Sequence, residues 1–186
     1  MNKKIVIFIS GKGSNAKNLI NYFSDNKEII ISHVFSNNKH SDLNSYLLNT
    51  KVQYFLFEEK EISGKVFDEL KKINPELIIL AGFLKKIPPS YLSFFKNKII
   101  NIHPSLLPKY GGKGMYGSNI HKKVIQNKES ESGITIHYVS KEYDAGKIIF
   151  QKKIKVDKND TPKKLEEKIH KLEYEYFPKI VESLLT

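Results

Sequence analysis

Two polar side chains stand at the end of an apolar run, where they are suited to proton-transfer chemistry. Asn101 and His103 are two residues apart in the segment 99–103. On an extended strand this spacing puts both side chains on the same face. An amide beside an imidazole can stabilise a developing oxyanion and transfer a proton. A polar pair at a strand end can equally be structural, so the surrounding sequence has to decide.

The segment that follows this pair, 104–117, is rich in Pro and Gly. It is too long for a simple connector, and long loops inside compact domains are usually functional. The sequence therefore predicts a functional loop directly after the polar pair.

A second candidate site is the glycine-rich turn 11–16, which matches the pattern G-x-G-x-x-G/A between an apolar run and a helical pattern. A dinucleotide site would also need an acid after the second strand, but the residues there are Ser36, Asn37 and Asn38. A Walker loop is excluded because no Lys-Ser or Lys-Thr ends the turn. What remains is a helix N-terminus with free N–H groups and the Ser14 hydroxyl, which suits one phosphate monoester. The alternative is an ordinary turn with Ser14 as the helix cap.

Apolar runs that alternate with helical patterns are expected to position these residues. The predicted strands are 5–9, 29–35, 52–57, 76–82 and 99–103, and the predicted helices among them are 15–23, 43–48 and 66–73. A helix over 119–126, an antiparallel strand pair over 134–139 and 147–156, and a last helix opened by Asp160, Thr161 and Pro162 complete the pattern. This order predicts an α/β fold, a doubly wound and mostly parallel sheet whose ligand crevice lies beyond the carboxyl ends of the strands.

Composition limits the class of protein. The 186 residues fit a single domain, 1–186, and the absence of cysteine excludes disulfides and thiolate metal sites. The apolar run 5–9 is shorter than the core of a signal peptide, and no stretch reaches membrane-spanning length. We therefore expect a cytoplasmic protein without membrane partners.

The formal net charge of +11 raises the question of nucleic-acid binding. All 31 basic residues are Lys, whereas specific phosphate and base recognition usually relies on the bidentate guanidinium of Arg. A solvated lysine surface that reflects codon bias is the favoured interpretation, and no specific nucleic-acid partner is expected. A polyanion-binding surface stays open as the alternative.

Four segments in family-like order and spacing resemble the folate-dependent glycinamide ribonucleotide transformylases, or phosphoribosylglycinamide formyltransferases. They are 9–15, 80–84, 101–110 and 143–146. The stretch 101–108, with its later Asp, marks the wider group of folate-dependent formyltransferases and formyl hydrolases. The segment 10–15 is similar to the glycinamide ribonucleotide enzyme and to the formyltetrahydrofolate deformylase. The resemblance covers nearly the whole chain.

The resemblance implies a Rossmann-like formyltransferase fold and a role for each matching residue. The catalytic residues would be Asn101, His103 and Asp144, and the substrate-binding residues Gly13, Ser14, Asn15 and Glu173. Folate contacts would come from Leu84, Lys85, Lys86, Ile87 and Asn101, and more weakly from Lys65. Lys85 stands where relatives commonly carry Arg, and the segment 111–117 is richer in glycine than the usual loop, which suits closure over the folate.

The reaction implied is formyl transfer from the co-substrate 10-formyltetrahydrofolate to glycinamide ribonucleotide, without a metal, by a monomer or homodimer. Residues 1–100 would mainly form the substrate-phosphate half, and residues 101–186 the catalytic and folate-contacting half. Two alternatives stay open: hydrolysis of the formylfolate, and a nucleotide- or RNA-binding module that uses the lysine surface.

The other histidines carry no clear signal. His137 lies on a predicted strand and is either a site residue contributed by a neighbouring strand or a hydrogen-bonded structural residue. The remaining ones, His33, His40, His121 and His170, have no metal-ligand spacing, so no metal site is predicted.

Overall fold

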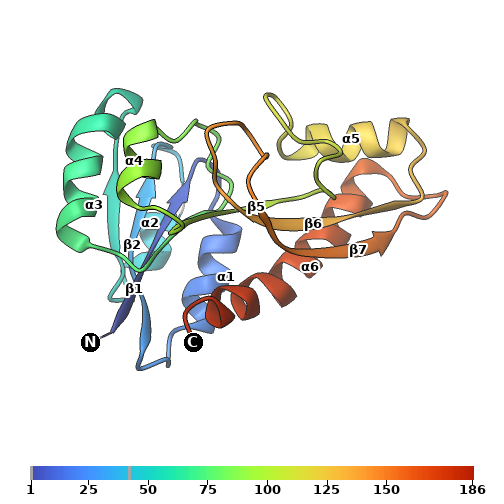
Figure 1. Cartoon of the computed structure of the whole chain (residues 1–186). Helices are drawn as coiled ribbons and strands as arrows, with labels where there is room; N and C mark the ends of the chain where they lie inside the picture. Colours follow the sequence, from blue (N-terminus) through green and yellow to red (C-terminus); the bar gives the residue numbers. More distant parts are fainter. Residues whose placement is uncertain (1, 42) are drawn as a thin grey trace.

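The computed structural model describes residues 2–41 and 43–186, and its centre is a seven-stranded sheet in the order β3-β2-β1-β4-β5-β6-β7 (Figure 1). The strands are β1 (Lys3–Ile9), β2 (Ile29–Ser36), β3 (Gln53–Leu56), β4 (Leu77–Leu80), β5 (Ile99–His103), β6 (Glu131–Tyr138) and β7 (Ile148–Lys155). The first five strands pair in parallel, and β6 is antiparallel to both β5 and β7. The predicted doubly wound, mostly parallel sheet with an antiparallel pair is confirmed.

Helices cover both faces of the sheet (Figure 1). They are α1 (Ser14–Tyr22), α2 (Leu43–Leu47), α3 (Phe67–Ile73), α4 (Pro89–Phe94), α5 (Ser118–Gln126) and α6 (Pro162–Ser183), with a π-helical turn over Ile62–Val66 before α3. Helix α4 was not predicted from the sequence, and it begins at Pro89 directly after its N-cap Pro88. Proline is tolerated in the first turn of a helix. The fully buried Tyr91 fixes α4 by donating a hydrogen bond from its hydroxyl to the Ile62 carbonyl, at 2.6 Å.

Strand β1 shows why the core has two layers. Its residues 5–9 are fully buried, as expected for a parallel strand covered on both faces. Ile5, Ile7 and Ile9 belong to the cluster under α1 and α6, whereas Val6 and Phe8 belong to the cluster under α3 and α4. Burying each such side chain contributes about 1.5–3 kcal/mol relative to leaving it exposed. The alternation of side chains along one strand therefore holds helices on both faces.

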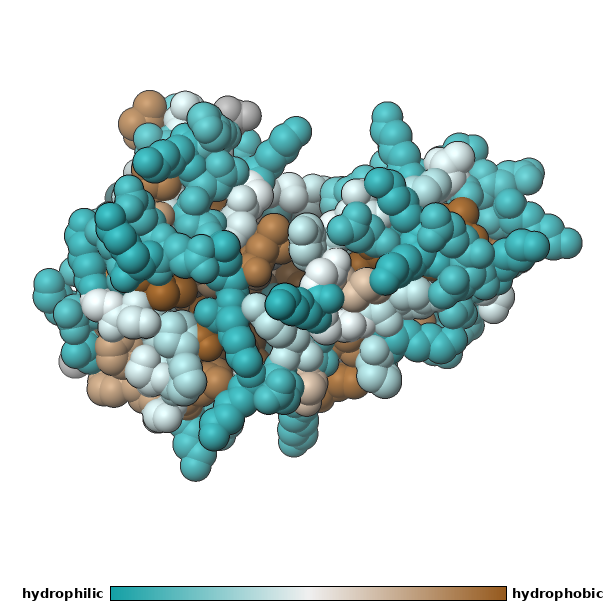
Figure 2. All heavy atoms as spheres, turned by 90° about the horizontal axis from the view of Figure 1, so that it is seen from above, coloured by the Kyte–Doolittle hydropathy of each residue, from teal (hydrophilic) through white to brown (hydrophobic). Residues whose placement is uncertain are grey.

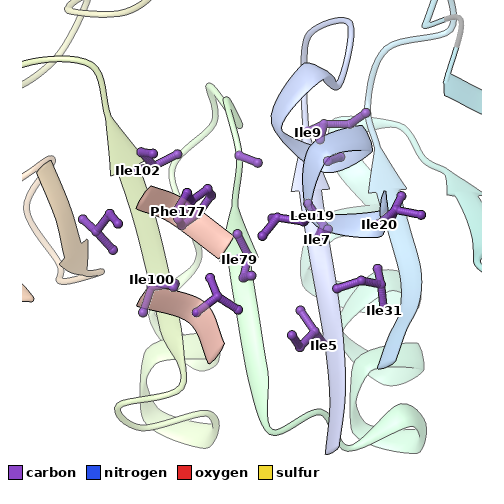
Figure 3. Packing of buried hydrophobic residues seen from close by; sticks show 14 of the residues in the cluster. Ile5, Ile7, Ile9, Leu19, Ile20, Ile31, Ile79, Ile100, Ile102 and Phe177 are labelled. Atoms are coloured by element: carbon purple, nitrogen blue, oxygen red, sulfur yellow. The ribbon is translucent and has the colours of Figure 1, made fainter. Parts of the chain in front are cut away.

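The long helix α6 lies across the sheet between the parallel and antiparallel parts (Figure 1). Its Phe177 is fully buried and lies close to Ile79, Ile100 and Ile102 of β4 and β5 (Figure 3). Thr161 caps the helix by accepting a hydrogen bond from the Lys164 N–H, as the Asp-Thr-Pro opening predicted. This packing fixes the rotation of α6 about its own axis, and therefore the position of Glu173.

The chain leaves β1 in one direction through β2 and β3, and returns in the other through β4 and β5. The loops after β1 and β4 start side by side and then turn toward opposite faces of the sheet, which opens a crevice at its carboxyl edge. Two hydrogen bonds join these loops: the Ser10 N–H donates to the Gly82 carbonyl, and the Leu84 N–H donates to the Ser10 hydroxyl, both at 3.0 Å. In the described part of the chain, no helix is long and apolar enough to cross a membrane.

Candidate active site

A cavity of about 690 Å³ lies at the carboxyl ends of the parallel strands. Its walls come from the loops after β1, β4 and β5, from the segment 112–117, and from the turn at Tyr143 and Asp144. One face of α6 closes it. Figure 2 looks onto the molecule from above and shows apolar residues in a hollow between hydrophilic side chains. Most of the predicted site residues line this single cavity, although the first and the last of them, Gly13 and Glu173, are 160 residues apart in the sequence.

The glycine-rich turn presents the N-terminus of α1 to the cavity. Gly13 is the N-cap with φ 76°, and Ser14 is the first helical residue, so the alternative interpretation of Ser14 as the cap is wrong. Gly13 is required here, because a Cβ would lie 3.0 Å from a Leu43 methyl group on a backbone that L-residues rarely adopt. Among the residues that the structure describes, no side chain caps the helix. The first N–H groups are therefore available to an anion.

Asn15 and Glu173 join the two walls near this turn. The Asn15 side-chain N–H donates to the Glu173 carboxylate at 2.9 Å. Glu173 is 5% exposed, and burial raises the pKa of its carboxyl above the ordinary 4.5. The Asn15 carbonyl oxygen is buried without a hydrogen-bond partner among the described residues. This part of the cavity thus presents oxygen acceptors and suits a ligand with hydroxyl or amine donors.

Asn101 is oriented by a histidine on the neighbouring antiparallel strand. It pairs directly with His137 across β5 and β6, and its amide nitrogen lies 3.1 Å from His137 Nε2. His137 Nδ1 lies 2.9 Å from the Tyr138 carbonyl, so Nδ1 carries the hydrogen and Nε2 accepts from Asn101. Burial lowers the pKa of His137, which favours this neutral form. The second amide hydrogen of Asn101 remains free to donate to a ligand.

His103 is held at one ring nitrogen and faces a carboxylate with the other. Its Nε2 donates to the Tyr110 carbonyl at 2.8 Å. Its Nδ1 lies 3.6 Å from Asp144 Oδ1, which is an ionic contact too long for a hydrogen bond. The imidazole is 4% exposed. This arrangement leaves Nδ1 as the nitrogen that can exchange a proton.

Asp144 contacts three separate elements of the site. Its Oδ2 accepts a hydrogen bond from the Gly112 N–H at 2.8 Å, and its Oδ1 lies 3.7 Å from His137 Nε2. The turn is pressed against β6, because a Cβ at Gly146 would lie only 1.6 Å from the Tyr138 carbonyl oxygen. This close approach brings the carboxylate beside both histidines.

The residues predicted to contact folate lie beside this centre. Leu84, Lys85 and Lys86 line the main cavity, whereas the buried Ile87 lines a smaller neighbouring cavity of about 60 Å³ that Asn101 and His137 also line. Lys85 forms an ion pair with Glu59 at 2.6 Å.

Lys65 lies apart from the other predicted folate contacts. It pairs with Glu61 at 3.6 Å and lies over the Phe55 ring, and neither cavity includes it among its lining residues. The structure therefore brings together all the predicted site residues except Lys65.

Sequence reasoning missed two histidines of the cavity wall, His121 and His170. His170 could have been found, because it lies three residues before Glu173 and one turn after Glu166 on the same helix face. No such signal marks His121. The other buried residues of α5, Ile120 and Val124, are apolar, and the place of His121 in the wall depends on how α5 packs against α6.

Comparisons with known proteins identify the family of the chain. Residues 3–181 match the family model described as formyl transferase. The chain is 34% identical over 189 residues to the chloroplastic phosphoribosylglycinamide formyltransferase of Arabidopsis thaliana, covering 96% of this chain and 64% of that protein. It is 33% identical to the phosphoribosylglycinamide formyltransferase of Bacillus subtilis, covering 98% of this chain and 95% of the relative. The chain thus spans less than two thirds of the plant relatives' length, 64% and 61%.

Solved structures give the same result. The glycinamide ribonucleotide transformylase 1 of Geobacillus kaustophilus matches with a TM-score of 0.90 at 27% identity, over 100% of both chains. The phosphoribosylglycinamide formyltransferase of Anaplasma phagocytophilum matches with a TM-score of 0.87 at 32% identity, over 97% of this chain and 85% of that one. Sequence and fold agree, and the chain belongs to the formyl transferase family.

Proposed function

We propose that this chain transfers the formyl group of 10-formyltetrahydrofolate to the amine of glycinamide ribonucleotide, a step of de novo purine synthesis. The observation that carries the proposal is that Asn101, His103 and Asp144 share one cavity with the free N-terminus of α1. Because β4 separates β1 from β5, the two groups are about 10 Å apart. A ribonucleotide can span this distance between its phosphate and its amine.

The phosphate end would use main-chain donors. The N–H groups at the start of α1 and the helix dipole favour a phosphate monoester, and the Ser14 hydroxyl can add a donor. Glu173 and Asn15 stand beside this turn with acceptors for the rest of the ribonucleotide.

At the catalytic end, the amine would attack the formyl carbon directly. A new carbon–nitrogen bond forms, the bond between the formyl carbon and N10 of the folate breaks, and the amine proton passes to N10. The free amide hydrogen of Asn101 and a protonated or hydrogen-bonding His103, which takes up its proton at Nδ1 as the amine attacks, would stabilise the tetrahedral oxyanion. A covalent enzyme intermediate is not proposed, because the sequence has no cysteine and no serine in a recognisable nucleophile motif.

His103 and Asp144 would divide the proton transfer between them. The Tyr110 carbonyl occupies Nε2, so Nδ1 is the nitrogen that receives and returns the proton. The carboxylate of Asp144 faces this nitrogen and would stabilise the positive charge that the ring gains when it takes the proton. The contact of 3.6 Å can shorten when substrates bind, as catalytic contacts often do.

Formylfolate would bind beside this centre as a co-substrate, without a metal. Its contacts would come from the segment 84–87 and the smaller cavity, where Lys85 and Lys86 offer charge to carboxylates. Lys65 would meet only a distal part of the folate, because it lies outside the lining of both cavities. The glycine-rich segment 111–117 would close over the bound folate.

One assay tests the function. The protein is mixed with 10-formyltetrahydrofolate and glycinamide ribonucleotide, and the folate product is followed by absorbance. Turnover that needs both substrates supports the proposal. Formate release without the ribonucleotide would show instead that the protein hydrolyses the formylfolate.

The lysine surface offers a rival of another class, a nucleotide- or RNA-binding module. We expect nucleic-acid binding in the non-specific range, on the order of 10⁻⁴ to 10⁻⁶ M at physiological salt, and weaker with added salt. Tight, sequence-selective RNA binding without folate binding would favour the rival.

A further inference from the structure

His121 is a buried polar residue in the cavity wall to which the proposed mechanism gives no role. It lies on α5 and is 2% exposed. Its Nδ1 is enclosed and has no hydrogen-bond partner among the residues that the structure describes. A buried polar group without a partner destabilises the folded protein. An apolar ring at this position would stabilise the unliganded protein at least as well as the imidazole does.

The imidazole of His121 is neutral at physiological pH. Burial, and to a smaller extent the nearby His170 and His103, lowers its pKa to about 4. A neutral ring offers one donor and one acceptor, so it can either donate a hydrogen bond to a hydroxyl or accept one from it. It can also do so without adding charge to the cavity.

The surroundings of His121 indicate which ligand group it would meet. The Asn15 carbonyl oxygen is a second buried atom without a partner, and the Glu173 carboxylate accepts from the Asn15 amide. All three residues line the main cavity. Together they offer several acceptors and call for a ligand that brings several donors, as the hydroxyls of a sugar do.

We propose that His121 is a specificity-determining residue that hydrogen-bonds a sugar hydroxyl of the bound ribonucleotide. This inference rests on the proposed function, since that function supplies the ribonucleotide. The enclosed Nδ1 would meet the hydroxyl if the ring turns toward the cavity in the complex, and it would then gain the hydrogen bond that the unliganded protein lacks. Its removal should weaken substrate binding and at the same time stabilise the unliganded protein.

The test compares wild type with His121→Phe and His121→Asn. Phe keeps the ring without its nitrogens, and Asn keeps a polar atom near the position of Nδ1. Calorimetry measures the Kd for glycinamide ribonucleotide alone, and thermal unfolding without ligand measures stability. We expect Phe to raise the Kd about tenfold with an unchanged or higher Tm, and Asn to restore most of the affinity. The Kd for 10-formyltetrahydrofolate should stay the same.

Analogues of the ribonucleotide lacking the 2′- or the 3′-hydroxyl identify the contact. Removing the contacted hydroxyl should weaken binding less in His121→Phe than in wild type, because the two changes remove the same bond. His33→Phe is the matched control. The Nδ1 of His33 is also buried without a partner, but His33 lies on β2 outside the cavity, and its loss should leave the Kd unchanged.

The outcomes separate this inference from the proposed function. A wild type that binds the ribonucleotide without formyl transfer would overturn the function and leave His121 to be judged by the Kd values. A normal Kd in His121→Phe, or equal hydroxyl penalties in variant and wild type, would overturn the role of His121 even if transfer is normal. A lower Tm with an unchanged Kd would make His121 a packing residue.

Discussion

The two ends of the cavity present different chemical groups, main-chain N–H groups at one end and side chains at the other. The end after β1 presents main-chain N–H groups of α1, held by the left-handed backbone of Gly13. The end after β5 presents side chains, each oriented by another residue: Asn101 by His137, and His103 by Tyr110. Substitutions at the first end should therefore act on substrate affinity. Substitutions at the second should act on turnover.

The largest expected effect is at the side-chain end, in Asp144→Asn. Asn cannot supply the negative charge that faces His103 Nδ1 during proton transfer, nor can it relay a proton. We expect kcat to fall by roughly 10² or more. Steady-state kinetics measures this loss, and the pH profile should lose or shift one limb.

The binding constants and Tm of Asp144→Asn provide the control. Asn retains an oxygen that can accept from the Gly112 N–H, so the contact between the turn and the loop survives. Both substrates should bind nearly as in wild type. If kcat stays near normal, Asp144 only shapes the turn, and the division between the two ends fails.

At the main-chain end, Ser14→Asp should act on affinity. A carboxylate at the start of α1 occupies the positive end of the helix dipole and repels the substrate phosphate. Hydrogen bonds to charged groups contribute about 1.5–3 kcal/mol, so we expect the KM for glycinamide ribonucleotide to rise tenfold or more. The Tm should be unchanged or higher, since an acid suits this position of a helix.

Ser14→Ala is the matched comparison for Ser14→Asp. It removes the hydroxyl and leaves the main-chain donors, so its KM should rise much less. An unaltered KM in the Asp variant would show that the phosphate binds elsewhere in the cavity.

His137→Phe tests whether the side-chain end depends on its supporting residue. Phe removes the acceptor that orients the Asn101 amide, and we expect kcat to fall about tenfold. In His137→Gln an oxygen can replace Nε2, and most of the activity should return. Equal losses in both variants would mean that His137 acts by packing alone.

The two ends also differ in how well the sequence predicts them. The glycine pattern reports a local requirement, the left-handed residue before α1, and the turn was predicted at its observed place. Asn101 and His103 were predicted to share a face by strand alternation alone, and both line the cavity. The fold class followed from the same local patterns, because apolar runs and helical periods alternate along the chain.

What the sequence left open depends on contacts between distant elements. His137 had two interpretations, and the antiparallel register that sets it opposite Asn101 decides between them. Asp144 accepts from the Gly112 N–H, 32 residues away in the sequence. His121 joins the wall through the packing of two helices. No local pattern encodes these three contacts.

The smallest expected effect concerns stability, in Glu173→Gln. Burial raises the pKa of Glu173 in the folded protein above the ordinary 4.5, although the Asn15 hydrogen bond and the nearby His170 oppose this shift. The folded state therefore binds this proton more tightly than the unfolded state does. By linkage, the stabilising contribution of protonated Glu173 is complete below the unfolded pKa and is lost as pH rises through the folded pKa.

Gln has no proton to lose, and its carbonyl oxygen can still accept from Asn15. We expect Glu173→Gln to match wild type in Tm at about pH 4 and to exceed it by a growing margin toward pH 7. Thermal unfolding across this range measures the difference, while calorimetry should show weaker ribonucleotide binding, because a neutral amide accepts hydrogen bonds from hydroxyls less strongly than a carboxylate. A margin that does not change with pH would mean that Glu173 titrates normally. The buried carboxylate would then not destabilise the folded protein, and substrate binding would have no destabilisation to offset.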